Sequence, residues 1–163
     1  MTDKELKKLI ETAENEPRLV AAAVSGLKDK VLDYKPSPEK WSVREILAHL
    51  ADAEIIYGMR MRQMLADKDP VIGPIDQDAW AQNLGYRETS PPESVALFGL
   101  LRHANLRVLR RIKAEDTKKS AFHPEYKRQF TLEELLGRMA GHAENHLAQI
   151  EELKEAAKQS VVH

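Results

Sequence analysis

The sequence of 163 residues contains no cysteine, so disulfide bonds, thiolate metal ligands and cysteine nucleophiles are all excluded. Nitrogen and oxygen atoms are the good metal donors that remain, and any thiol chemistry must use a thiol supplied from outside. An excess of basic residues is also lacking, because 25 Lys and Arg stand against 26 Asp and Glu, which gives a formal net charge of −1. We therefore expect no nucleic-acid partner.

Long apolar runs are missing as well. No segment approaches the length that spans a bilayer, and the charged stretch MTDKELKKLIE has no hydrophobic core of a secretory signal. We therefore expect a cytoplasmic protein without a membrane partner. A hydrophobic content of 42% and a charged content of 31% are typical of one soluble domain, which we expect to cover residues 1–163.

Helical signals dominate the chain. No internal repeat and no alternating apolar pattern favours a sheet, so we expect an all-α fold. Ser42 with Glu45, and Thr131 with Glu134, have the spacing of capping boxes that begin helices. The helical segments that we predict are 3–15, 17–33, 42–67, 91–112 and 131–159.

Two long irregular connections separate these helices. The first, 68–90, contains two prolines and two glycines, and its length favours a lid or wall of a functional site over a simple connector. The second, 113–130, precedes the last helix. If the segments 3–15 and 17–33 are counted as one helical region, there are four substantial helices. Joined by these connections, they predict a four-helix bundle with long crossover connections.

His142 and His146 are the most informative residues of the chain. Residues four apart lie one above the other on a helix, and both imidazoles fall within the apolar arc of the last helix. Burying two imidazoles costs free energy unless hydrogen bonds or a shared metal ion satisfy them. Two satisfied core histidines are the alternative, but one metal ion would satisfy both rings at once.

A third imidazole lies at the edge of the apolar face of the 42–67 helix. His49 has Ile46 and Ala53 as its neighbours on that helix. Together with His142 and His146 it would supply three nitrogen ligands from two facing helices. Three protein ligands leave a coordination position open for water or substrate, which favours catalysis over a structural site.

Glu54 and Asn105 are candidate pocket residues. Glu54 lies on the apolar side of its helix, where it could orient an imidazole, act as a base or form a salt bridge with Arg60. Asn105 lies within the predicted inner arc of the 91–112 helix, where it either joins an internal polar network or lines the metal pocket. That arc also contains the apolar residues Leu97, Phe98, Leu101, Val108, Leu109 and Ile112.

Trp80 and His123 are the remaining candidates for the site, whereas His103 is not one. Trp80 in the first connection either walls a pocket or anchors the connection to the core. His123 in the second connection could overhang the site or belong to a turn. His103 projects away from the buried arc of its helix, so we interpret it as a surface residue.

The segments KPSPEKWSVREILAHLADAE and FHPEYKRQFTLEELLGRMAGHAENHLAQIEEL resemble the DinB-like superfamily of metalloenzymes, in particular its bacillithiol-transferase-like, or YfiT-like, branch. This resemblance implies a four-helix bundle, a homodimer, and a divalent metal ion, zinc or nickel, held by three histidines. Carried over to this sequence, those ligands are His49, His142 and His146.

Three functions are compatible with these residues. The resemblance implies a metal-dependent transferase, in which a low-molecular-weight thiol is activated for attack on an electrophilic substrate. A hydrolase would instead activate water, with a nearby carboxylate such as Glu54 as its base. A third alternative is a helical bundle that binds metal without catalysis, in a stress-associated or scaffolding role.

Overall fold

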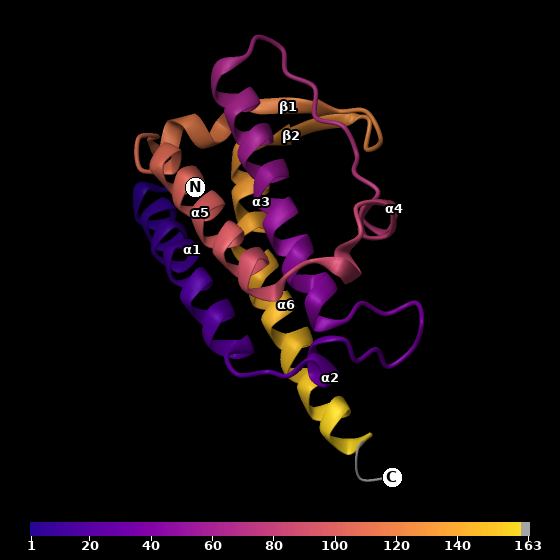
Figure 1. Cartoon of the computed structure of the whole chain (residues 1–163). Coiled ribbons are helices and arrows are strands. Elements are labelled where there is room, and N and C mark those ends of the chain that lie inside the picture. Colours follow the sequence, from indigo (N-terminus) through magenta and orange to yellow (C-terminus); the bar gives the residue numbers. More distant parts are fainter. Residues whose placement is uncertain (161–163) are drawn as a thin grey trace.

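The computed structural model describes residues 1–160 and is mostly helical (Figure 1). Four long helices form the bundle, namely α1 (Asp3–Val24), α3 (Val43–Ala66), α5 (Pro91–Leu109) and α6 (Leu132–Gln159). The shorter elements are α2 (Asp29–Leu32), α4 (Gln77–Asn83), the 3-10 helices η1 (Tyr86–Glu88) and η2 (Ala114–Lys118), and the strands β1 (Ser120–His123) and β2 (Arg128–Thr131).

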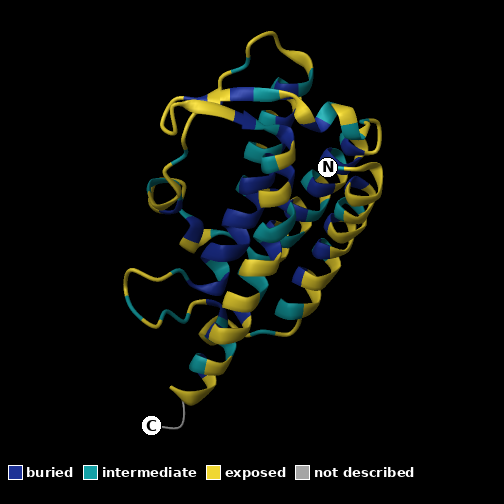
Figure 2. Cartoon of the chain, turned by 180° about the vertical axis from the view of Figure 1, so that it is seen from behind, coloured by how far each residue is buried: buried dark blue, intermediate teal, exposed yellow. Residues whose placement is uncertain are grey.

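Each of the four long helices packs against two of the others. Both α1 and α3 pack against α5 and α6, so α1 and α3 lie diagonally opposite each other in the bundle. Buried residues lie mainly on the helix sides that face the bundle interior (Figure 2). The four-helix bundle with crossover connections, predicted from the sequence, is confirmed.

Capping boxes begin three of the four long helices. At the start of α3, the Ser42 amide donates to Glu45 Oε2 at 2.7 Å, and the Glu45 amide donates to Ser42 Oγ at 3.3 Å. Thr131 and Glu134 form the same reciprocal pair at the start of α6. Thr2 caps α1 in the same way, which the sequence analysis did not identify. Each box satisfies two backbone amides that the first helical turn leaves without partners.

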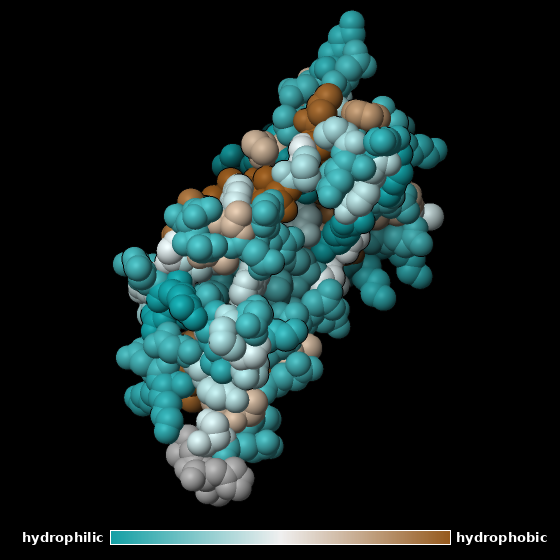
Figure 3. Space-filling view, turned by 90° about the vertical axis from the view of Figure 1, so that its right-hand side faces the viewer, coloured by the Kyte–Doolittle hydropathy of each residue, from teal (hydrophilic) through white to brown (hydrophobic). Residues whose placement is uncertain are grey.

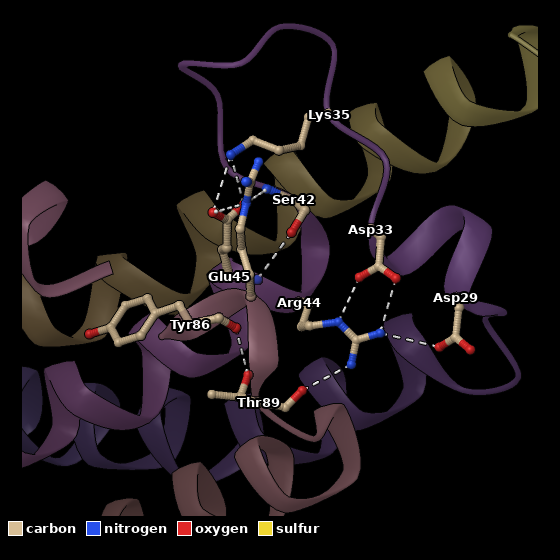
Figure 4. A network of polar contacts seen from close by, with 9 residues as sticks. Asp29, Asp33, Lys35, Ser42, Arg44, Glu45, Tyr86 and Thr89 are labelled. Atoms are coloured by element: carbon tan, nitrogen blue, oxygen red, sulfur yellow. Dashed lines mark hydrogen bonds and ion pairs between the residues drawn. The ribbon is translucent and has the colours of Figure 1, made fainter. Parts of the chain in front are cut away.

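An arginine ties the start of α3 to its surroundings (Figure 4). The Arg44 guanidinium donates to Asp33 at 2.6 Å, to Asp29 at 3.2 Å and to the Thr89 carbonyl at 2.9 Å. These contacts connect α3 with the segment before it and with the end of the 68–90 connection. These contacts therefore hold the start of α3, the helix that carries His49, in position.

Helix α1 differs from the prediction of two segments, because it continues through Pro17. Proline has no amide hydrogen, so the Ala13 carbonyl one turn earlier loses its helical partner. The Arg102 guanidinium from α5 donates to that carbonyl at 3.1 Å. A contact from another helix thus replaces the missing hydrogen bond, and the helix does not end there.

A small antiparallel hairpin is the second difference from the prediction, in a fold that is otherwise helical. Strands β1 and β2 pair from Ser120 with Thr131 to His123 with Arg128. Each strand has four residues, so the alternation of buried and exposed side chains is too short to stand out in the sequence. The hairpin lies across the end of the bundle where α3 ends and α6 begins (Figure 1).

The 68–90 connection is attached to this hairpin. The Ile72 amide donates to the Phe122 carbonyl at 3.0 Å, and the Phe122 amide donates to the Pro70 carbonyl at 2.9 Å. From there the connection runs beside α3 and forms α4 (Figure 1). Both irregular connections of the sequence therefore meet on one side of the molecule.

The face that carries α4 and the hairpin turn is mostly hydrophilic, with apolar side chains gathered in its upper half (Figure 3). Within residues 1–160, none of the helices combines the length and apolar character that a bilayer crossing requires.

Candidate metal centre

Three imidazoles from two helices converge in the bundle. His49 lies on α3, whereas His142 and His146 lie one turn apart on α6. The Nε2 atom of His142 is 2.9 Å from Nε2 of His49 and 3.2 Å from Nε2 of His146. One potential ligand atom from each of these residues lies within 4.8 Å of the other two. We call these three residues the histidine triad.

The number of close contacts at His142 Nε2 favours a shared metal ion over hydrogen bonds alone. A proton on His142 Nε2 can point directly at one neighbour, which leaves the second close contact without a hydrogen bond. Two imidazole nitrogens that each lie about 2.1 Å from one tetrahedral ion are about 3.4 Å apart. The observed separations of 2.9 and 3.2 Å are near this value.

Burial keeps the triad in the neutral form that binds metals. The pKa of His49 and of His142 is lowered from near 6.5 to about 3, first by burial and then by the neighbouring imidazoles. Burial also lowers the pKa of His146, although Gln149 opposes this effect. His146 Nδ1 lies 2.9 Å from Gln149 Oε1, so Nδ1 carries the proton and Nε2 stays free to bind a metal.

Aromatic rings pack around the triad and fix its geometry. The Trp41 and His49 rings lie 4.7 Å apart between centroids, and the Tyr57 and His142 rings lie 5.6 Å apart. His49 is only 4% exposed. Rigid aromatic neighbours of this kind limit the movement of the imidazoles and restrict access of water.

A cavity of about 160 Å³ opens beside the triad and is lined by His49 and His142. Its wall includes Trp80 and several other residues of the 68–90 connection, so this connection does border the site as expected. His123 of β1 also lines the cavity. The other polar residues of its wall are Asp52, Tyr57, Arg60, Gln77, Tyr86, Glu125, Tyr126 and Arg138.

The structure places Glu54 and Asn105 outside this cavity. Glu54 is 1% exposed and accepts a hydrogen bond from Arg102 at 2.8 Å. Asn105 donates to the Glu54 carbonyl at 2.9 Å and to its carboxylate at 3.0 Å. Both residues therefore belong to an internal ion network, and the salt bridge considered between Glu54 and Arg60 is wrong because Arg102 takes that place.

The histidine of α5, His103, lies on the surface, as the sequence predicted. His103 is exposed and away from the triad. In contrast, Arg60 and Arg138 both line the cavity but were not among the predicted pocket residues. Their signal in the sequence is weak, because charged residues at helix edges are usually solvated.

The neutral triad predicts a specific pH dependence of stability in the metal-free protein. Unfolded chains protonate imidazoles near pH 6.5, whereas the folded protein resists protonation of His49 and His142 until about pH 3. Because the unfolded state binds more protons in this range, the free energy of unfolding should fall as the pH drops below about 6.5.

Urea denaturation between pH 7 and pH 5 would measure this loss, in a range where most carboxylates stay ionised. A His49→Gln, His142→Gln double variant should show a shallower dependence. An equally steep dependence in the variant would contradict the assignment.

Comparisons with known proteins identify a family for this chain. The sequence model of the DinB superfamily matches residues 12–150. The Bacillus subtilis protein named "Putative metal-dependent hydrolase YfiT" is 32% identical over 146 residues, which cover 90% of this chain and 82% of that protein. An Oceanobacillus iheyensis protein with the same description, OB0782, is 30% identical over 145 residues, 88% of this chain and 83% of that protein.

A solved structure of Bacillus subtilis YfiT has the same fold. It superposes with a TM-score of 0.89 at 29% identity, over 96% of this chain and 89% of that chain. That protein is described as a probable metal-dependent hydrolase with an unusual four-helix bundle topology.

Proposed function

The chain belongs to the DinB superfamily, and we propose that it is a metal-dependent enzyme that activates a low-molecular-weight thiol for attack on an electrophile. Zinc and nickel are the metals we propose, because both accept imidazole ligands. The observation that carries this proposal is the convergence of three Nε2 atoms beside a cavity.

The number of ligands supports catalysis over a structural role. Within residues 1–160, no further His, Asp or Glu joins the three histidines of the group. Structural zinc sites are closed by four protein ligands, whereas catalytic sites keep a position for a small molecule. Since His49 and His142 also line the cavity, a molecule bound there would lie next to the triad.

The charges of the site favour a thiolate. A divalent cation would supply positive charge that stabilises the thiolate and so lowers the pKa of the thiol. The triad adds no negative charge of its own, because all three ligands are neutral imidazoles. Trp41 and the other apolar neighbours restrict water and thereby strengthen this electrostatic effect.

Hydrolysis is the second candidate, because the relatives are named as metal-dependent hydrolases. Glu54 does not suit the role of base, since its carboxylate is buried against Arg102. Asp52 is a carboxylate that does line the cavity, but it accepts a hydrogen bond from the Tyr86 hydroxyl at 2.6 Å. As the base of a hydrolase, Asp52 would have to release this contact or act while keeping it.

A turnover assay separates the two candidates. We expect untagged protein loaded with zinc or nickel to accelerate the reaction of monobromobimane with at least one thiol of a panel that includes bacillithiol, mycothiol and glutathione. The chain has no cysteine, so the protein itself adds no thiol background to this fluorescence assay.

The matched variants test whether the triad carries the activity. His146→Ala should abolish the acceleration, whereas His103→Ala on the exposed side of α5 should leave it unchanged. Metal-dependent cleavage of p-nitrophenyl acetate without any thiol would favour the hydrolase instead. Metal binding without turnover in either assay would favour the bundle without catalysis.

A further inference from the structure

Two arginines face the cavity beside the triad. Arg60 comes from α3 and Arg138 from α6, and both line the cavity that His49 and His142 border. Neither guanidinium takes part in an ion pair with another residue of the described range 1–160. The positive charge on this side of the cavity is therefore not neutralised by a protein carboxylate in direct contact.

Each guanidinium is held in position by neighbouring groups. Arg60 is half-buried and donates to the Gly73 carbonyl of the 68–90 connection. Arg138 lies over the Phe130 ring at 4.8 Å and near the Tyr126 ring at 6.0 Å. Contacts with aromatic faces orient a guanidinium and leave N–H groups at its edge free for a ligand.

The charge of Arg138 acts on Arg60. Burial lowers the pKa of Arg60, Tyr57 opposes this effect, and the charge of Arg138 adds to it. Arg60 is half-buried and Arg138 is exposed, and the repulsion between the two like charges raises the free energy of the empty site. An anion between them would remove this repulsion and accept charge-assisted hydrogen bonds from both.

His123 supplies an independent indication of a ligand. This residue is 5% exposed and lines the same cavity, and its Nδ1 atom has no hydrogen-bond partner. A buried polar atom without a partner costs free energy, and a ligand in the cavity is one way to satisfy it. The charges of Arg60 and Arg138 both lower the pKa of this imidazole, so His123 lies close to the two arginines.

Neither acidic residue of the cavity wall forms an ion pair with Arg60 or Arg138 in the part of the chain that the structure describes. Asp52 is occupied by the hydroxyl of Tyr86, as described above. Glu125 lies exposed in the turn of the hairpin and forms no ion pair with Arg60 or Arg138. An anionic group could therefore reach the two guanidinium groups without first displacing a carboxylate.

We propose that the substrate that reacts at the triad carries a small oxyanion group, a carboxylate or a phosphate, which Arg60 and Arg138 bind. This inference rests on the proposed function, because it takes the triad as the reacting centre. With about 160 Å³ available, the cavity suits one small acidic group and the few atoms next to it. Binding of the anion would point the adjacent atoms toward His49 and His142.

Binding of simple probes tests the proposal. Benzoate and phenyl phosphate represent the two oxyanions, and benzamide is the neutral counterpart of benzoate. We expect isothermal titration of the metal-free full-length protein to detect at least one of the two anions, with benzamide at least about tenfold weaker. Metal-free protein is the right sample, because a carboxylate could otherwise bind the metal directly.

Variants assign the binding to the arginines. Arg138→Met should weaken binding of the anion by roughly ten- to hundredfold, which corresponds to the loss of a charge-assisted hydrogen bond. Arg107→Met is the matched control, because Arg107 is an exposed arginine of α5 outside the cavity. Arg60→Met should act like Arg138→Met, but it also removes the contact with Gly73, so Arg138→Met decides.

The outcomes separate this inference from the proposed function. Equal weakening by Arg138→Met and Arg107→Met, binding of benzamide as tight as that of benzoate, or no binding of either anion would overturn the inference. Arginine-dependent binding by a protein that shows no metal-dependent turnover would support the oxyanion site and reject the proposed function. Turnover that is unaffected by Arg138→Met would support the function and reject the oxyanion site.

Discussion

Alanine in place of His142 is expected to reduce the affinity for zinc by at least about a hundredfold. The Nε2 atom of His142 lies between those of His49 and His146, at 2.9 and 3.2 Å, so its loss removes the central ligand. Full zinc sites with four ligands contribute roughly 10–16 kcal/mol, which is about 3 kcal/mol for each ligand. Competition with a chromophoric chelator would measure the change.

A surface histidine provides the control for this experiment. His103→Ala removes the same side chain from an exposed position on α5 and should leave the affinity unchanged. Metal analysis of untagged protein, purified without chelator, should agree with the titration. If His142→Ala and His103→Ala lowered the affinity equally, the triad would not be the metal site.

Methionine in place of Arg102 is expected to destabilise the protein by about 3–5 kcal/mol. Arg102 is 0% exposed and bonds to the carboxylates of Glu16 and Glu54, which come from α1 and α3. Its loss would leave two buried carboxyl groups without a cation, and burial already raises the pKa of Glu16. For a chain of this length, we expect the melting temperature to fall by roughly 10 °C.

An exposed ion pair offers a matched comparison. Arg110→Met breaks a contact with Glu14 in which both side chains are about half exposed, and such pairs contribute less than about 1 kcal/mol. The loss of stability in the Arg102 variant should shrink toward pH 5, because burial raises the pKa of Glu16 and its unpaired carboxyl group can take up a proton. Equal melting temperatures for the two variants would show that the buried network contributes little.

Local signals in the sequence predicted much of the fold. The capping boxes at Ser42 and Thr131 fixed the starts of α3 and α6, because a cap depends on residues within one helical turn. His142 and His146 were placed together for the same reason, since their spacing alone brings them close on a helix. Apolar periodicity oriented His49 toward the same interior.

Contacts between distant segments could not be predicted in this way. The interior arc expected for α5 included Leu97, which is 44% exposed, whereas Arg102 is fully buried. Periodicity treats an arginine as a surface residue, but carboxylates from two other helices surround this one. The continuity of α1 through Pro17 depends on the same arginine, so it had no local signal either.

The residues of the cavity wall also divide into those that local sequence signals predicted and those that depend on contacts between distant segments. Trp80 and His123 were candidates because aromatic residues in long connections often border sites, and both line the cavity. Arg60 and Arg138 line the same cavity because α3 packs against α6, while the hairpin and the 68–90 connection supply other parts of its wall. No spacing within the sequence indicates that these two arginines line one cavity.

The separation of the triad along the chain makes metal binding a measure of tertiary structure. His142 and His146 can form a two-ligand site in any helical piece of α6, but His49 lies 93 residues before His142. Bringing it to them in an unfolded chain would cost the entropy of closing a long loop. Coordination by all three histidines would therefore require α3 to be docked on α6, and a bound metal would act as a reversible cross-link between the two halves of the sequence.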